Sequence, residues 1–260
     1  MNKKIIRNAR IITMNERLDI LPNGNILIEN GKISAITTQS LEDTDAEITD
    51  AEGMFLLPGL INTHTHLPMT MLRGFADDLP LQEWLYNRVF PMEAKLTKED
   101  QVELAKLGMM EYLTSGITAN FDMYLDNTCH AKASTELGFR TVLCGSMNDF
   151  GGTVPETEEE YYRLNDYSPL VSYKLGFHAE YTTKRELMEE LAQLAGKMKE
   201  PVYLHLAEKY DLLYTCGSDY HGPVIKPDIA LGTGISNNLG ICDEKIPERL
   251  SAAIAAKCSA

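Results

Sequence analysis

Two histidines one residue apart, His64 and His66, have the clearest chemical potential in this sequence. They follow Leu60 and Ile61, which come directly after a proline-glycine break. Successive side chains of a β-strand alternate between its two faces, so both imidazoles would point the same way. Two imidazoles on one face can supply two nitrogen ligands to a divalent metal. We therefore predict a metal site at the end of this strand.

Two further histidines lie at the ends of similar apolar runs. His178 follows the run 171–177, and His205 lies near the end of the run 201–206. In a parallel α/β barrel the C-terminal ends of the strands meet at one face, where catalytic residues gather. We expect both histidines at that face and predict that His205 is a third metal ligand.

The elements that must position these histidines change in type near residue 58. Before it, short β-branched runs flank Asn30-Gly31, and Asn-Gly between two strands is the strongest short hairpin signal. After it, short apolar runs alternate with helical patterns. These runs are residues 60–64, 117–122, 139–145, 171–178 and 201–206. Alternating strands and helices favour a parallel α/β fold, most simply a barrel.

The helices between these strands are marked by capping residues. Thr97 with Asp100 predicts an N-terminal cap, and Gly116 predicts the end of the same helix. Thr183 with Glu186 fits a capping box. The apolar stripe that follows this box is expected to be core packing.

Composition excludes some classes of partner. The net charge of −14 argues against nucleic acid or an anionic membrane surface, because phosphates would be repelled. Residues 156–162 form an acidic run, which we expect to be the solvated start of a helix. No apolar run approaches the roughly 20 residues that span a bilayer. The five cysteines contain no close pair and fit reduced thiols.

Location and partners follow from the same features. The first residues become polar too soon for a signal-peptide core, so we expect a cytoplasmic protein. The expected partner is a small-molecule substrate, with no nucleic acid and no membrane. Homo-oligomer formation is left open.

The stretch around the first histidine pair resembles the amidohydrolase superfamily at the end of its first barrel strand. Within that superfamily, about residues 1–208 are most similar to the methylthioadenosine/S-adenosylhomocysteine deaminases. The motifs that carry this narrower likeness are residues 64–69, 90–96 and 205–208. The resemblance implies a metal-dependent TIM-like barrel with a small N-terminal β-sandwich. It also implies a metal-bound water that attacks an aminopurine carbon and releases ammonia.

The resemblance implies roles for individual residues. Glu208 corresponds to the glutamate that moves a proton from the metal-bound water to the leaving nitrogen, which requires hydrogen-bond reach of both groups. His178 resembles the family's substrate-contacting histidine. Glu93 resembles a ribose-binding residue, and Trp84 resembles one that lines the pocket. The cofactor implied is one divalent metal: zinc first, with iron or manganese as alternatives.

One stretch departs from the family's pattern. The family usually places an arginine just after the third strand, where it can meet a substrate carboxylate. Residues 143–148 contain no arginine. This departure argues against S-adenosylhomocysteine more than against methylthioadenosine or adenosine.

After Glu208 the chain takes on a second resemblance. About residues 206–250 resemble the C-terminal end of a PHP (polymerase and histidinol phosphatase) domain, through the motif Gly-Ser-Asp-Tyr-His-Gly. The resemblance implies that Asp219 and His221 are metal ligands. We therefore expect a β-rich segment over 1–57, an amidohydrolase-like portion of an incomplete barrel over 58–208, and a PHP-like segment over 209–260.

Three functions stay open from sequence. The first is a metal-dependent hydrolase that deaminates an aminopurine nucleoside. The second is a PHP-type phosphoesterase built on Asp219 and His221. The third is an inactive fusion or truncated remnant, because the candidate strands are fewer than the eight of a closed barrel. The strand candidates 201–206 and 212–216 are also too close for a parallel crossover.

Overall fold

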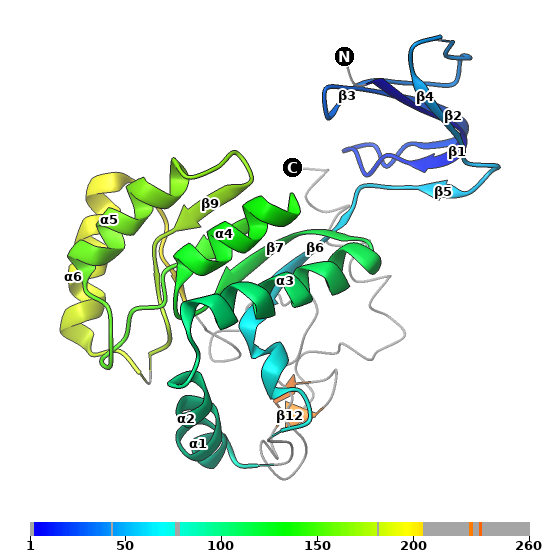
Figure 1. The fold of residues 1–260 in the computed structure, drawn as a ribbon. Helices are drawn as coiled ribbons and strands as arrows, with labels where there is room; N and C mark the ends of the chain where they lie inside the picture. Colours follow the sequence, from blue (N-terminus) through cyan, green and yellow to red (C-terminus); the bar gives the residue numbers. More distant parts are fainter. Residues whose placement is uncertain are drawn as a thin grey trace. The chain divides into compact units, whose positions relative to one another are not determined.

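The computed structural model describes residues 3–42, 44–75, 79–180 and 182–204, and the backbone of two short later strands (Figure 1). Contacts divide the chain into two compact units, with the boundary between Gly59 and Leu60. All candidate site residues that the structure describes belong to the second unit.

The first unit is built on a mixed five-stranded sheet. Its strands are β1 (Lys3–Ile12), β2 (Ile20–Glu29), β3 (Lys32–Thr37), β4 (Glu47–Asp50) and β5 (Phe55–Leu56). The order is β3-β2-β1-β4, with β5 also paired to β1. Strands β1, β2 and β3 are antiparallel neighbours, whereas β4 and β5 run parallel to β1. The β-rich character is confirmed, and the second layer of a sandwich stays an expectation.

The predicted hairpin joins β2 to β3. Its turn residues Asn30 and Gly31 have φ of 52° and 76°. Asparagine tolerates this left-handed region better than most residues, and glycine enters it without steric cost. The local sequence therefore sets the pairing of the two strands.

The second unit contains a parallel sheet in the order β6-β7-β8-β9. Its strands are β6 (Leu60–Thr65), β7 (Ile117–Met123), β8 (Arg140–Cys144) and β9 (Val171–Lys174). Strand β10 (Gly176–Phe177) then pairs in parallel with β11 (Tyr203–Leu204). The strands expected along this part of the chain, and their parallel direction, are confirmed.

Helices connect these strands. They are η1 (Leu67–Leu72), α1 (Leu81–Trp84), η2 (Leu85–Val89), α2 (Phe90–Glu93), α3 (Lys98–Thr114), α4 (Asn127–Leu137), α5 (Val154–Asn165) and α6 (Arg185–Met198). In Figure 1, α3 and α4 lie side by side along the sheet, and α5 and α6 form a neighbouring pair. Each long helix follows one parallel strand and precedes the next, as a βα repeat requires.

Helix α3 begins and ends where the sequence predicts. Thr97 and Asp100 form a reciprocal capping box, and Gly116 just beyond the helix has φ of 80°. The capping box predicted at Thr183 and Glu186 is wrong, because α6 takes Lys184 as its N-cap residue. The backbone N–H of Lys184 donates instead to Oδ1 of Asp149, at 2.9 Å.

The core of the second unit lies between the helices and the sheet. One cluster joins η1, α3 and α4 through Leu67, Val102, Ala105, Met109, Cys129, Ala133 and Phe139. A second cluster contains Leu191 and Leu194, from the apolar stripe of α6 that we expected to be core packing. Burying one large apolar side chain stabilises the fold by about 1.5–3 kcal/mol, so these clusters hold the helices against the strands.

The C-terminal expectations fall mostly outside the described residues. They include the strand candidate 212–216 and the whole PHP-like motif. The backbone described there consists of β12 (Ile229–Ala230) and β13 (Gly234–Ile235), which pair in antiparallel fashion. Closure of a barrel therefore stays a prediction.

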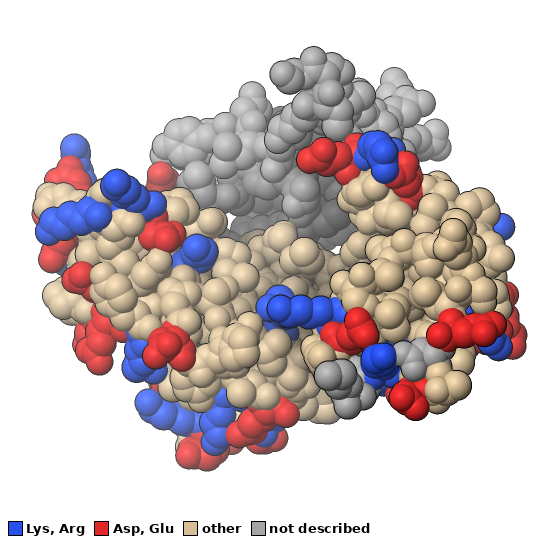
Figure 2. Space-filling model, turned by 90° about the horizontal axis from the view of Figure 1, so that it is seen from above, with Lys and Arg blue, Asp and Glu red and all other residues tan. Residues whose placement is uncertain are grey.

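Two observations on the described residues concern membranes and surface charge. None of the described helices is both long and apolar enough to cross a bilayer. On the face drawn in Figure 2, acidic and basic side chains are interspersed. This face therefore shows no dominant patch of one sign.

Candidate active site

The end of β6 carries the histidine pair. The rings of His64 and His66 lie side by side, with centroids 5.3 Å apart and planes at 78°. Thr65 between them is buried, and its hydroxyl lies 2.5 Å from that of Tyr112 on α3. The alternation predicted from the sequence is therefore present, because Thr65 contacts the helix layer while the two imidazoles lie together.

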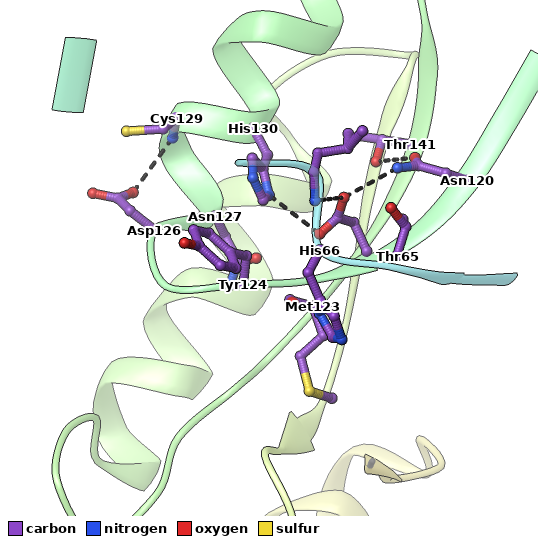
Figure 3. A network of polar contacts seen from close by, with 12 residues as sticks. Thr65, His66, Asn120, Met123, Tyr124, Asp126, Asn127, Cys129, His130 and Thr141 are labelled. Atoms are coloured by element: carbon purple, nitrogen blue, oxygen red, sulfur yellow. Dashed lines mark hydrogen bonds and ion pairs between the residues drawn. The ribbon is translucent and has the colours of Figure 1, made fainter. Parts of the chain in front are cut away.

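The ring of His66 is oriented by the neighbouring strand. Its Nδ1 lies 2.6 Å from the backbone oxygen of Met123, at the end of β7 (Figure 3). A carbonyl can only accept, so Nδ1 carries the proton and the lone pair lies on Nε2. A backbone carbonyl on the second ring nitrogen is the usual way a protein orients a metal-binding histidine.

A pocket of about 300 Å³ brings five sequence-predicted residues together: His64, His66, Trp84, Glu93 and His178. The two histidines come from the end of β6, Trp84 ends α1, and Glu93 ends α2. His178 follows β10. Four separate segments thus deliver side chains to one space, and the role of each residue stays a prediction.

Glu93 is a half-buried acid in this pocket. The hydroxyl of Tyr124 donates a hydrogen bond of 2.7 Å to its Oε1. Burial raises the pKa of Glu93 and outweighs the opposite effect of that bond. The carboxylate is therefore positioned to accept hydrogen bonds and becomes protonated more readily than an exposed glutamate.

His178 is held in one orientation. Its Nδ1 lies 2.8 Å from the hydroxyl of Thr182, and that hydroxyl donates to the backbone oxygen of Ala179 at 3.1 Å. A hydroxyl has a single proton, so it accepts from Nδ1 and the lone pair of His178 lies on Nε2. Burial lowers the pKa of His178, which keeps the ring neutral near pH 7.

Four predicted residues cannot be placed. His205, Glu208, Asp219 and His221 lie outside the described residues. Within the part of the chain that is described, no group of three or more His, Cys, Asp or Glu residues could hold a metal. The geometry therefore supplies two imidazoles of the predicted metal site.

Sequence reasoning missed a buried polar cluster near His66 (Figure 3). Oδ2 of Asp122 accepts the backbone N–H of Leu67 and the side-chain amide of Asn120, both at 3.2 Å. Oδ1 of Asp122 lies 3.7 Å from Nδ1 of His130, which is too long for a hydrogen bond. Burial raises the pKa of Asp122 well above its usual value and lowers that of His130 to about 4.

This cluster fixes the backbone that follows His66. Leu67 is the next residue along the chain, and its N–H is held by the Asp122 carboxyl group. A signal for this cluster is present in the sequence. Strands of a parallel sheet are usually apolar throughout, yet β7 contains Asn120 and Asp122, both buried.

Comparison with known proteins supports the likeness on which these predictions depend. The sequence pattern of the Amidohydrolase family matches residues 55–227. The chain belongs to the amidohydrolase family. The family match extends past Glu208, where we expected the likeness to end, and the PHP resemblance stays a prediction.

Two relatives of this amidohydrolase are named 5-methylthioadenosine/S-adenosylhomocysteine deaminase. The protein from Caldicellulosiruptor saccharolyticus is 40% identical over 228 residues, which is 85% of this chain and 53% of the relative. The protein from Bacillus cereus is 34% identical over 213 residues, covering 77% of this chain and 49% of the relative. The chain therefore spans about half the length of these relatives.

A solved structure supports the fold assignment. An adenosine deaminase from Xanthomonas campestris with bound zinc aligns with a TM-score of 0.65 and 29% identity. The alignment covers 78% of this chain and 49% of that protein. The α/β arrangement described above is therefore that of the amidohydrolases.

Proposed function

We propose that this amidohydrolase is a metal-dependent deaminase of an aminopurine nucleoside, with methylthioadenosine or adenosine as the substrate class. The observation that carries the proposal is the pocket that gathers His64, His66, Trp84, Glu93 and His178. The names of the two relatives and of the zinc-bound neighbour support the same chemistry. In the overall reaction, water replaces the amino group of the purine and ammonia leaves.

His64, His66 and His205 are the proposed ligands of one divalent ion, zinc first. A catalytic zinc site keeps three protein ligands and one open position, and Asp219 or His221 is a candidate fourth ligand. The pair His64–His66 fits this donor set, because the rings adjoin and the protonated Nδ1 of His66 leaves the lone pair on Nε2. Such a metal lowers the pKa of a bound water towards about 7.

The other pocket residues bind and orient the nucleoside in this proposal. The Glu93 carboxylate accepts hydrogen bonds from ribose hydroxyls, and Tyr124 keeps it in place. Nε2 of His178 accepts a hydrogen bond from the substrate, because Nδ1 already donates to Thr182. Trp84 supplies an aromatic wall for the base. Glu208 is the proposed proton carrier between water and leaving nitrogen.

Metal analysis with single substitutions tests the ligand set. His64→Ala and His205→Ala should each abolish stoichiometric metal, measured per chain on purified protein. His178→Asn is the matched control, because it removes an imidazole from the same pocket and should keep the metal. Unchanged metal content in both alanine variants would show that the ligand set is wrong.

Product analysis tests the reaction. The metal-loaded chain should release ammonia from adenosine or methylthioadenosine and leave p-nitrophenyl phosphate intact. Glu208→Gln should lower turnover by about 10²–10⁴-fold with metal still bound, the usual contribution of a general acid–base group. Nitrophenol release in place of ammonia would favour the phosphoesterase function. Absence of both products in the metal-loaded protein would favour an inactive remnant.

A further inference from the structure

A second, larger cavity opens beside the pocket and reaches past Glu93. Its volume is about 800 Å³. The two spaces share Phe90, Glu93, Leu125, Ser146, Asn148 and Phe150 in their walls. His64, His66 and His178 line the first space and are absent from the walls described for the second. Glu93 therefore stands at the junction, with the histidines on one side and the larger cavity on the other.

The larger cavity is acidic. Besides Glu93, its walls include Glu156, Glu159 and Glu160 of α5. Arg163 is the one basic side chain among its described lining residues. That guanidinium is already engaged, because it donates to the Thr128 hydroxyl at 2.9 Å and lies 3.6 Å from Glu160. The acidic run that we expected only to be a solvated helix start thus also faces a cavity.

A buried amide oxygen in the same walls lacks a hydrogen-bond partner among the residues that the structure describes. Asn127 is 2% exposed, and its amide nitrogen donates to Oε2 of Glu160 at 3.3 Å. Its amide oxygen has no hydrogen-bond partner among the described residues. A buried acceptor without a donor is unfavourable, so this wall is suited to a ligand group that donates hydrogen bonds.

We propose that this cavity receives the substituent on the 5′ carbon of the nucleoside and selects a cationic, ammonium-bearing substituent over a carboxylate. The inference depends on the proposed function, which places the base near the histidines and the ribose at Glu93. A group attached to the far side of the ribose then extends into the acidic cavity. Carboxylates and an unpartnered amide oxygen are all acceptors, and an ammonium group supplies three donors and a positive charge.

The missing arginine of residues 143–148 fits the same preference. Ser146, Met147 and Asn148 from this stretch line the cavity, and all three are uncharged. A substrate carboxylate would therefore meet several glutamates and a single arginine that is already bonded. Like charges a few ångströms apart repel.

Three adenosine analogues that differ only at the 5′ position test the proposal at pH 7. They carry an amino group, a methylthio group or a carboxylate. Binding is measured by the fluorescence of Trp84, because it is the single tryptophan of the chain and lines the adjoining pocket. The amino compound should bind at least about 10-fold more tightly than the carboxylate. Equal affinity of the two charged compounds would overturn the proposal.

Helix α5 offers a matched pair of charge reversals. Glu159→Lys places a positive charge in the cavity wall and should reverse the preference between amine and carboxylate. Glu158→Lys makes the same change on the same helix, at a residue that does not line the cavity, and should leave the preference unchanged. Glu159→Gln gives a milder variant and should reduce the preference. Equal effects at 158 and 159 would contradict the assignment.

Ammonia release separates this inference from the proposed function. Ammonia from all three analogues with equal affinities would leave the deaminase function intact and overturn the charge selection. Graded binding in the expected order without ammonia from any analogue would support the cavity assignment and contradict the deaminase function.

Discussion

His66 depends on a strand that carries none of the predicted metal ligands. Two consecutive residues at the end of β7 hold it: the Met123 carbonyl bonds its ring, and the Asp122 carboxyl group bonds the N–H of Leu67. The hydrogen bonds continue from Asp122 to β8: the Asn120 amide donates to Asp122, and the Thr141 hydroxyl on β8 donates to Oδ1 of Asn120 at 2.6 Å. The geometry of one imidazole is thus set by buried polar groups on two neighbouring strands.

Asp122 gives a pH dependence of stability with a definite sign. Burial raises the pKa of the folded-state carboxyl group well above its ordinary value of 3.8. Between those two values the folded state binds more protons than the unfolded state, so the free energy of unfolding falls as pH rises. Asp122→Asn removes this titration and should remove up to about 1.4 kcal/mol of that fall per pH unit. Urea unfolding of chelator-treated wild type and Asp122→Asn, at a series of pH values from 4 upward, measures this difference. If the free energy of unfolding has the same pH dependence in both proteins, the prediction is wrong.

Protonation of Glu93 should weaken nucleoside binding at low pH. Its raised pKa means that the carboxylate is lost at a higher pH than in an exposed glutamate. KM for the nucleoside should therefore rise as pH falls through this raised pKa. Glu93→Gln should weaken binding by roughly 10- to 100-fold and flatten the profile, because a hydrogen bond to a charged group contributes about 1.5–3 kcal/mol. Glu99→Gln, an exposed residue in the first turn of α3, is the control and should keep the wild-type profile.

The side-by-side placement of His64 and His66 could be predicted because strand alternation is a local rule. Glu93 and Trp84 were chosen from family likeness, and their roles stay predictions. Asp122 and His130 were not predicted, because their importance comes from complete burial next to each other, and they lie on different elements. A polar residue in an apolar strand is visible in sequence, but its partner is set by tertiary packing.

At the scale of elements, two glycines allow the end of β8 to approach the β9–β10 segment. A Cβ added at Gly145 would lie 2.8 Å from the backbone oxygen of Gly176. A Cβ added at Gly176 would lie 2.7 Å from the backbone oxygens of both Gly145 and Tyr203. These atoms belong to the backbone and cannot rotate away. The approach brings Ser146 and His178 within reach of one pocket.

Gly176→Ala should therefore destabilise the fold by about 1–3 kcal/mol, the usual cost of overpacking. Gly196→Ala is the matched control, because Gly196 lies within α6 and a Cβ there meets nothing within 4 Å. That change should stabilise the fold by up to about 1 kcal/mol through helix propensity. Urea unfolding of both variants checks the pair. Loss of stability in both, or in neither, would show that the close approach at Gly176 is not limiting.

The ends of an element could be predicted where the residues that terminate it are close to it in sequence. The capping box of α3 and the Asn30-Gly31 turn each need only neighbouring residues. The start of α6 was misassigned because its first turn is bonded by Asp149, which lies 35 residues away. The π-helical turn η2 between Trp84 and Glu93 has no sequence signal that we recognised. Barrel closure depends on segments far apart in the chain, which no local pattern specifies.

At the scale of the whole molecule, two sources of negative charge could act on a charged ligand: the net charge of the chain and the acidic wall of the cavity. The chain carries a net charge of −14, and the cavity walls repeat that sign. Figure 2 shows acidic and basic groups interspersed on one face, so the surface there lacks a dominant negative patch. A local acidic wall, more than the average charge, should therefore decide which charged ligands enter.

Ionic strength separates these two sources of selectivity. The Debye length falls from about 30 Å at 0.01 M salt to about 10 Å at 0.1 M, so the long-range field of the whole protein is screened over that range. If the wall dominates, the 5′-amino nucleoside should lose only a few-fold in affinity between these salt concentrations. It should still bind more tightly than the carboxylate at 0.1 M, because close pairs in a partly enclosed space are screened less. The methylthio compound has no charge, so its affinity should not change with salt concentration. Titration of Trp84 fluorescence in sodium chloride measures all three. Collapse of the amine's advantage at 0.1 M would instead assign the preference to the net charge of the chain.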